Sequence, residues 1–261
     1  MKYAISTVLA AALVAACALP AQANPGKAVV KAVTGTASYT DVDGFAHPVT
    51  VGAALKESDT ITTGKDSSVT LFLDRNGPGV SLGANSVLRL ERLSYEDSRL
   101  GPVIKTRLDL RQGEIYGAVN KLVGKSKYEV VTPRGLVEVR GTQFYVSART
   151  GDVYVVSGTV TVTITWNVAG GPTQTRTVTV GAGQMLALST SYTSITQIAP
   201  TASNLTPAQL AALAKLRLLT GYTSSLPTGA VSETFKVTEK VISTKTTYEV
   251  TEPPTKIVVS P

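Results

Sequence analysis

The chain has 261 residues, of which 43% are hydrophobic and 16% charged, and its formal net charge at pH 7 is +7. It holds one histidine, His47, and one cysteine, Cys17. These counts exclude a multi-histidine metal site and argue against a cysteine-dependent nucleophile, since Cys17 lies in the segment discussed next. The basic balance favours anionic partners such as envelope polymers, lipids or nucleic acid.

The first 23 residues have the pattern of a secretory signal peptide. Lys2 precedes an apolar run over residues 4–19, Pro20 ends that run, and Ala21-Gln22-Ala23 offers a small-x-small cleavage site. We therefore expect cleavage after residue 23 and a periplasmic or secreted protein. Residues 14–17, Val-Ala-Ala-Cys, are close to a bacterial lipobox, so the alternative is a lipoprotein anchored through Cys17. No later stretch has the roughly 18 continuous apolar residues that a membrane span requires.

Residues 27–200 are expected to form one all-β domain. Valine and threonine recur throughout, turn residues punctuate short apolar stretches, and no long helical periodicity occurs before residue 204. Such a pattern predicts short antiparallel strands in a sandwich or a short β-solenoid. A domain of roughly 170 residues buries enough surface to fold without disulfides or metal. None of these residues is a cysteine, so no disulfide is expected.

Four connections have the turn residues of β-hairpins: Asp41–Gly44, Asp74–Gly77, Thr150–Asp152 and Ala169–Pro172. The last of them would join a strand over Thr159–Trp166 to a strand over Thr175–Val180. Along the first of these strands, apolar residues alternate with threonines: Val160, Val162, Ile164 and Trp166 share one face. This alternation predicts a sheet with one buried and one exposed face.

The segment from Lys127 to Ser147 combines two strand patterns with one turn. Thr132–Gly135 has the chemistry of a type I turn, so a strand is expected on each side. Leu136–Arg140 alternates between apolar and charged residues until Gly141, where we expect a bulge or a close approach of two backbones. Phe144 and Val146 then resume the apolar face.

These residues resemble the FecR domain, named after the periplasmic regulator of ferric citrate uptake, with its Thr-Pro-x-Gly turn and Arg-Gly-Thr-x-Phe strand. The matching positions are Thr132, Pro133, Gly135, Arg140, Gly141, Thr142 and Phe144. The resemblance covers roughly residues 27–190 and implies an envelope-side domain that senses or binds through protein contacts. The chain departs from the regulator, because no sigma-factor-binding segment and no transmembrane helix stand upstream. For Arg140 and Thr142 we expect a buried or cross-strand hydrogen bond, and for the others a structural role.

A helix is predicted over residues 204–221. Thr206–Gln209 is a capping box with proline at the first helical position, and Leu205 can pack onto Leu210. Leu210, Leu213, Leu216 and Leu219 mark one apolar face, which is expected to dock on the β domain. Residues 222–261 are rich in serine and threonine and are expected to form a mobile tail, with strand propensity over residues 235–250.

Catalytic chemistry finds little support in the residue types. Six carboxylates could in principle form a glycosidase pair, but no spacing selects two of them: Asp59, Asp74, Glu91, Asp109, Glu114 and Glu138. His47 is expected to be a solvated loop histidine, and no phosphate-cradling or calcium-binding loop pattern occurs. The sequence therefore predicts a protein that is not an enzyme, with no catalytic, metal or cofactor residues.

Basic residues between Arg89 and Arg111 are interleaved with acidic ones, which disfavours nucleic acid as a partner. Lys121, Lys125 and Lys127 are more one-signed and lie in an expected hairpin loop, so they are the candidates for an anionic contact.

Together these features predict an exported, non-enzymatic FecR-like recognition or scaffold protein of the bacterial envelope, whose partner is an envelope protein or a cell-wall polymer. The alternatives are a carbohydrate-binding or adhesin-like surface protein and a soluble sensor partner in envelope signalling.

Overall fold

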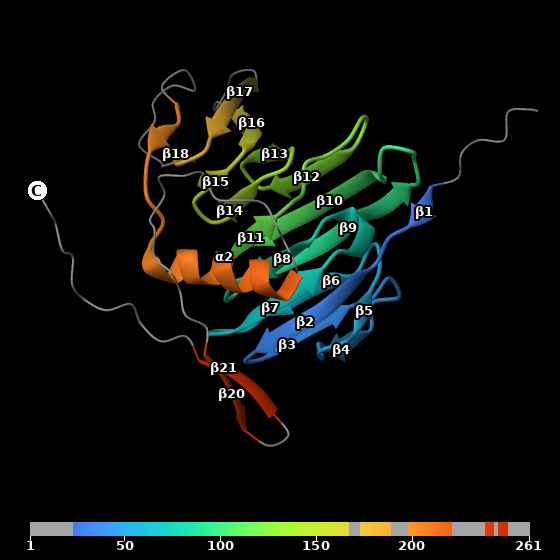
Figure 1. Cartoon of the computed structure of the whole chain (residues 1–261). Helices are drawn as coiled ribbons and strands as arrows, with labels where there is room; N and C mark the ends of the chain where they lie inside the picture. Colours follow the sequence, from blue (N-terminus) through green and yellow to red (C-terminus); the bar gives the residue numbers. More distant parts are fainter. Residues whose placement is uncertain (1–22, 167–172, 189–197, 221–237, 243–244, 250–261) are drawn as a thin grey trace, which may run out of the picture. The chain divides into compact units, whose positions relative to one another are not determined.

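The computed structural model describes residues 23–166, 173–188, 198–220, 238–242 and 245–249. The chain divides into two compact units, residues 1–224 and 225–261. Strands predominate in the first unit, and one α-helix stands near its end (Figure 1). The predicted all-β class with a single C-terminal helix is confirmed. The predicted signal peptide and Cys17 lie outside the described residues, as does most of the predicted tail.

One sheet, here called sheet A, has ten strands and forms one layer of a sandwich. Nine of them follow the order β17-β16-β13-β12-β10-β9-β6-β3-β4, and β1 pairs with β9. Its strands are β1 (Asn24–Pro25), β3 (Ala37–Thr40), β4 (Ala46–Pro48), β6 (Thr60–Thr63), β9 (Val87–Glu96), β10 (Val103–Gln112), β12 (Lys127–Thr132), β13 (Gly135–Val139), β16 (Thr159–Trp166) and β17 (Gln174–Gly181). Strands β10 and β12 run parallel, whereas the neighbouring pairs of the sheet are antiparallel.

The second layer, sheet B, has nine strands in the order β19-β18-β15-β14-β11-β8-β7-β2-β5. They are β2 (Ala28–Thr34), β5 (Ala54–Leu55), β7 (Ser68–Phe72), β8 (Gly79–Leu82), β11 (Glu114–Ala118), β14 (Gln143–Ser147), β15 (Val153–Ser157), β18 (Gln184–Leu186) and β19 (Thr201–Ala202). The chain passes repeatedly from one sheet to the other. One such passage joins β11 to β12 and carries Lys121 and Lys125, so the predicted hairpin loop there is wrong. Strand β12 pairs in parallel with β10, which requires a crossover connection, and here the chain crosses by way of β11 in sheet B.

At β14, sheet B is buried on both faces, so this strand has no exposed residue. Phe144 and Val146 belong to the core between the two sheets. Tyr116, Tyr145 and Tyr154 point to the opposite face and pack with leucines near the chain's single described α-helix. The period-two alternation of a strand therefore separates two cores, one on each side of the same sheet.

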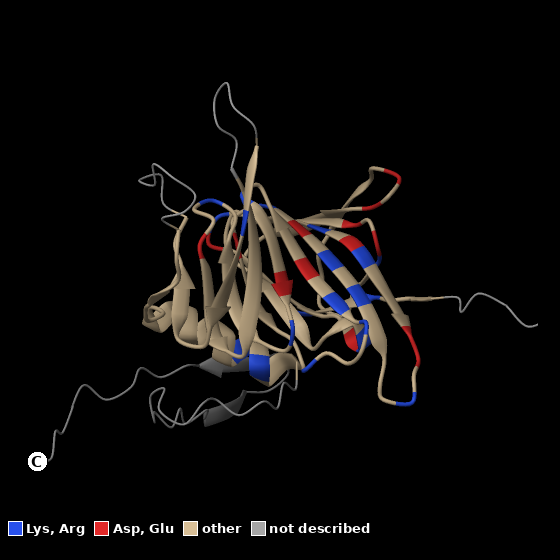
Figure 2. Cartoon of the chain, turned by 90° about the horizontal axis from the view of Figure 1, so that it is seen from above, with Lys and Arg blue, Asp and Glu red and all other residues tan. Residues whose placement is uncertain are grey.

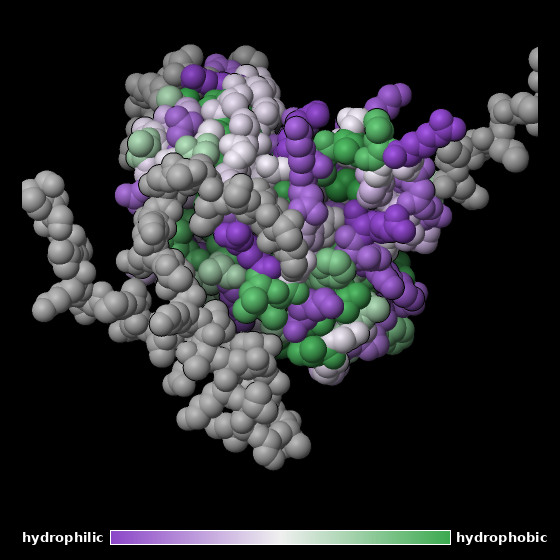
Figure 3. All heavy atoms as spheres, viewed as in Figure 1, coloured by the Kyte–Doolittle hydropathy of each residue, from purple (hydrophilic) through white to green (hydrophobic). Residues whose placement is uncertain are grey.

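This helix, α2 (Pro207–Thr220), covers the outer face of sheet B (Figure 1). The predicted capping box is present: the Thr206 amide donates to Oε1 of Gln209 at 2.9 Å, and the Gln209 amide donates to Oγ1 of Thr206 at 3.3 Å. Leu213 and Leu216 are buried, so the predicted docking face is confirmed in its centre. Leu210 is 40% exposed, so the predicted face is not fully buried at the first turn of the helix, and hydrophobic residues show beside hydrophilic ones in this region (Figure 3).

Three of the four predicted hairpins are present in the structure. β3 pairs with β4, β7 with β8, and β14 with β15, all antiparallel. A short 3-10 helix, η1 (Asp74–Asn76), forms part of the second turn. β16 and β17 also pair over eight residues as predicted, although the turn Ala169–Pro172 lies outside the described residues.

The second unit contains one described feature, an antiparallel pair of β20 (Thr238–Ile242) with β21 (Lys245–Glu249), within the stretch of predicted strand propensity. Across all the described ranges, the chain has no helix with the length and apolarity of a membrane span.

Candidate functional site

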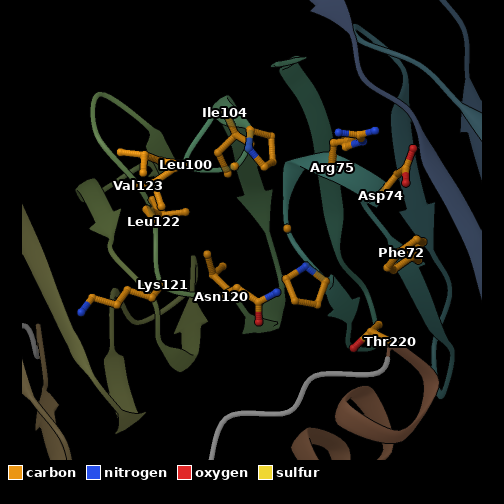
Figure 4. A pocket seen from close by; sticks show the side chains of 15 residues that line it. Phe72, Asp74, Arg75, Leu100, Ile104, Asn120, Lys121, Leu122, Val123 and Thr220 are labelled. Carbon is orange, nitrogen blue, oxygen red and sulfur yellow. The ribbon is translucent and has the colours of Figure 1, made fainter. Parts of the chain in front are cut away.

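A groove of about 400 Å³ opens where three connecting segments meet at one end of the sandwich. These segments are the turn between β7 and β8, the loop between β9 and β10, and the crossing from β11 to β12. Figure 4 shows Leu100, Leu122 and Val123 gathered on one side of it, with Phe72 on the other. Thr220, the last residue of α2, closes its lower end. The groove is thus mainly apolar, and Leu100 itself is 84% exposed.

Two cations border this groove, and they differ in their partners. Arg75 donates from Nη1 to Asp97 at 2.7 Å, and its guanidinium lies 5.4 Å from the ring centre of Tyr95. Lys121 is exposed and forms no ion pair with any residue that the structure describes. Its ammonium group points away from the apolar centre (Figure 4). Asp74 also lines the groove, so the local charge is mixed.

The Arg-Gly-Thr corner holds one wall of the groove in place. Thr142 and Val119 exchange two main-chain hydrogen bonds, each of 2.9 Å, and Val119 lines the groove. Thr142 is fully buried, and its Oγ1 donates to the carbonyl oxygen of Thr159 at 3.2 Å. Gly141 has φ of +101°, and a Cβ added there would lie 2.6 Å from Cα of Lys121. The predicted close backbone approach is therefore confirmed, and the segment it accommodates carries Lys121.

Phe144 connects this corner to the opposite wall through buried rings. It is fully buried opposite Gly117, where an added Cβ would overlap the Phe144 ring. Its ring meets Tyr128 edge-on, with the ring centres 6.3 Å apart. Tyr128 in turn lies 3.2 Å from the position of a Cβ on Gly77, a residue that lines the groove. Phe144 therefore lies in the core between the Arg-Gly-Thr corner and, through Tyr128, the turn that carries Gly77.

The remaining motif positions have local roles away from the groove. Thr132 donates from Oγ1 to the Gly135 carbonyl at 3.1 Å and accepts the Arg134 amide at 3.2 Å, which fixes the turn between β12 and β13. Pro133 is exposed in this turn. The predicted buried or cross-strand hydrogen bond is present for Thr142 and absent for Arg140 in the described part of the chain. Arg140 follows the end of β13 and is exposed, so water can satisfy its guanidinium.

Of the three candidate lysines, the structure brings only Lys121 to the groove. Lys125 is exposed in the crossing segment, and Lys127 is the exposed first residue of β12. The apolar lining residues Phe72, Leu100 and Leu122 were missed from the sequence. Leu100 was the one residue that the sequence could have singled out. It is an isolated apolar residue beside Gly101-Pro102 in a polar loop, so it cannot belong to the buried face of a strand.

The charged residues of β9, β10 and β12 form a paired network on the outer face of sheet A (Figure 2). Arg107 contacts Glu91 at 2.9 Å and Glu129 at 2.8 Å, and Lys105 contacts Glu96 at 3.2 Å. This arrangement confirms the predicted mixed-charge surface, in which neighbouring charges neutralise each other.

Two further clusters of titratable side chains are internally paired. His47 lies in β4 and not in a loop; its Nε2 is 2.8 Å from Asp41 Oδ2, and its ring stacks on Tyr39. The hydrogen bond from His47 lowers the pKa of Asp41. Both oxygens of Glu114 accept tyrosine hydroxyls at 2.9 Å, from Tyr116 and Tyr145. Burial, followed by the charge of Glu114, raises the pKa of Tyr145 to about 12. No group of three metal-binding side chains occurs among the described residues.

Comparison with known proteins gives one family match. Residues 59–161 match the family described as FecR protein. This range contains the Arg-Gly-Thr corner and most of the groove. No curated protein matches the chain.

Two solved structures of a candidate anti-sigma factor from Parabacteroides distasonis ATCC 8503 resemble the chain at 17% and 16% identity, with TM-scores of 0.38 and 0.37. Each match covers 56% of this chain and 59% of the other. The chain thus spans less than two thirds of that protein's length.

Proposed function

Because the chain carries a FecR domain over residues 59–161, we propose that the protein is an exported, non-enzymatic recognition module that acts in envelope signalling through protein contacts. Export rests on the signal pattern of residues 1–23. The absence of catalysis is proposed because the titratable clusters described above are small and mutually paired among the described residues.

The observation that carries this proposal is the groove, with its exposed leucine and its cation at the rim. Leu100 is 84% exposed beside Leu122 and Val123, and burial of such a surface against a partner is favourable by about 25 cal/mol per Å² of apolar area. Lys121 adds a positive charge at the border that has no ion-pair partner in the described part of the chain. The arrangement suits a protein segment that presents an apolar side chain next to an acidic one.

The test uses paired leucine variants. Leu100→Asp places a carboxylate in the groove, whereas Leu218→Asp makes the same change at a leucine of α2 that is 59% exposed and does not line the groove. Because both leucines are largely exposed, both variants are expected to fold. Each is isolated with crosslinked envelope proteins and analysed by mass spectrometry alongside the unaltered protein. We expect a defined envelope protein to be lost with Leu100→Asp and kept with Leu218→Asp.

Equal recovery with both variants would contradict recognition through the groove. Retention of cell-wall polysaccharide without any protein partner would instead favour the carbohydrate-binding alternative. Saccharide sites commonly present aromatic faces, and the groove has one aromatic lining residue, Phe72. For this reason the protein partner is the function that we propose.

A further inference from the structure

Among the described residues, strand β17 is a long edge of sheet A that pairs with no strand on its outer side. It runs over Gln174–Gly181 and pairs on one side with β16 in eight consecutive register positions without a bulge. The other outer strands of the two sheets are short: β4 has three residues and ends at Pro48, while β5 and β19 have two residues each. Natural proteins protect edges by shortness, proline, bulges or charge. In β17 the only such device is a single charged residue, Arg176.

The hydrogen bonds at one end of this strand show which backbone groups face outward. The Gly181 amide donates to Oε1 of Gln184 at 2.8 Å, and the carbonyl of its register partner Thr159 accepts the Thr142 hydroxyl. The Thr159/Gly181 pair is therefore of the non-hydrogen-bonded type. Alternation along the ladder then directs the amides and carbonyls of the even-numbered residues of β17 toward β16. Those of Thr175, Thr177 and Thr179 face outward.

The side chains of the same three threonines are exposed on the outer face of the sheet, and Val178 and Val180 are buried on the inner face. Thr177 already lies 3.4 Å from Thr163 through their hydroxyls. The edge thus offers three consecutive outward-facing backbone positions that carry β-branched residues, which favour strand pairing.

We propose that β17 pairs antiparallel with β17 of a second copy, on a two-fold axis at Thr177. In this register Thr177 faces Thr177 of the second copy, and Thr175 faces Thr179 in both directions. Three residue pairs with two bonds each give about six main-chain hydrogen bonds. Sheet A becomes continuous across the two copies.

The second copy is favoured as occupant because the edge is complementary to itself in this register. Threonine faces threonine on the outer side, a stabilising cross-strand combination. On the inner side Arg176 faces Val178 of the second copy, so no like charges stand directly opposite. Moving the axis to residue 176 would place the two arginines opposite each other and leave Thr179 without an outward-facing partner inside the strand. The interface uses neither Leu100 nor Lys121, so this proposal and the groove proposal succeed or fail separately.

Cysteine trapping tests the register directly. The background is the full chain with Cys17→Ser, which removes the single cysteine. A directly opposed, hydrogen-bonded pair has Cα atoms about 5.5 Å apart, within the range of a disulfide. We expect Thr177→Cys to form a disulfide-linked dimer on mild oxidation. Thr175→Cys and Thr179→Cys are the matched controls: each alone should give no dimer, whereas an equimolar mixture of the two should.

A second measurement uses the unlinked protein. Light scattering coupled to size exclusion should give twice the chain mass for the unaltered protein and for Thr177→Val, which keeps every main-chain donor. Thr177→Pro removes one outward amide without touching the ladder to β16, and its mass should fall to that of the monomer. A monomeric unaltered protein, a dimer that survives Thr177→Pro, or equal trapping by all three single cysteines would overturn the proposal.

Discussion

Replacing Gly141 by alanine tests whether the Arg-Gly-Thr corner determines the position of the groove wall. At φ of +101° an alanine is strained by roughly 1–2 kcal/mol. Its Cβ would also lie 2.6 Å from Cα and 3.0 Å from the amide nitrogen of Lys121, so the backbone of that segment must move. Crowding of this kind costs about 1–3 kcal/mol. We therefore expect the free energy of unfolding to fall by about 2–5 kcal/mol in total.

The matched control for this substitution is Gly183→Ala. Gly183 has φ of +73°, and an added Cβ there would meet no atom within 4 Å, so only the backbone strain applies. Urea unfolding of the two variants, followed by circular dichroism, should place Gly141→Ala about 1–3 kcal/mol below Gly183→Ala. Equal losses of unfolding free energy would refute this reasoning, because they would mean that the backbone at Lys121 moves aside without a cost in free energy. Binding of the groove's partner should weaken only in Gly141→Ala.

Four further substitutions address polar side chains: three at buried residues, Thr142, Tyr128 and Tyr145, and one at the exposed Arg140. Thr142→Val removes the donor to the Thr159 carbonyl and should lower the free energy of unfolding in urea by about 1–2 kcal/mol. Arg140→Gln, at an exposed site, should change it by less than about 0.5 kcal/mol. A larger loss for Arg140→Gln than for Thr142→Val would contradict a buried hydrogen bond at Thr142 and a solvated side chain at Arg140. The Tyr128 hydroxyl is buried without a partner among the described residues, so Tyr128→Phe should leave stability unchanged or raise it by about 1 kcal/mol, and a clear loss would indicate a hidden hydrogen bond. The pKa of Tyr145 is raised to about 12, above the value near 10 of an unfolded chain, so its contribution to stability is complete below about pH 10 and is lost as the pH rises toward 12. Tyr145→Phe should flatten the fall in unfolding free energy over that pH range, and an unchanged slope would count against this assignment.

Short-range patterns in the sequence predicted much of the secondary structure. The turn at Thr132–Gly135, the capping box at Thr206 and the alternation along β16 each depend on a few neighbouring residues, and each is present in the structure. The close approach at Gly141 was also predictable, because a glycine that interrupts a strand signals a backbone nearby. What the glycine could not reveal was which backbone approaches it.

The groove could not be predicted from the sequence because its walls come from segments that are far apart along the chain. Phe72, Leu100 and Leu122 meet only because the chain passes between two sheets, and no local pattern records that path. The crossing from β11 to β12 was mistaken for a hairpin for the same reason, since strand patterns do not show which sheet a strand joins. Helix α2 was placed correctly, but Leu210 was assigned to the buried face because helical periodicity cannot show where the underlying sheet surface ends.

By itself the sequence determined that this is a β-rich chain with a capped helix and a family-type corner. These features follow from local backbone preferences and from the period of apolar residues, which act within a few residues of one another. The tertiary structure alone decided that Gly141 accommodates Lys121, that Phe144 fills the space above Gly117, and that β17 is left as a long edge. Each of these depends on the pairing order of strands in two sheets, and that order is set by the burial of the whole core.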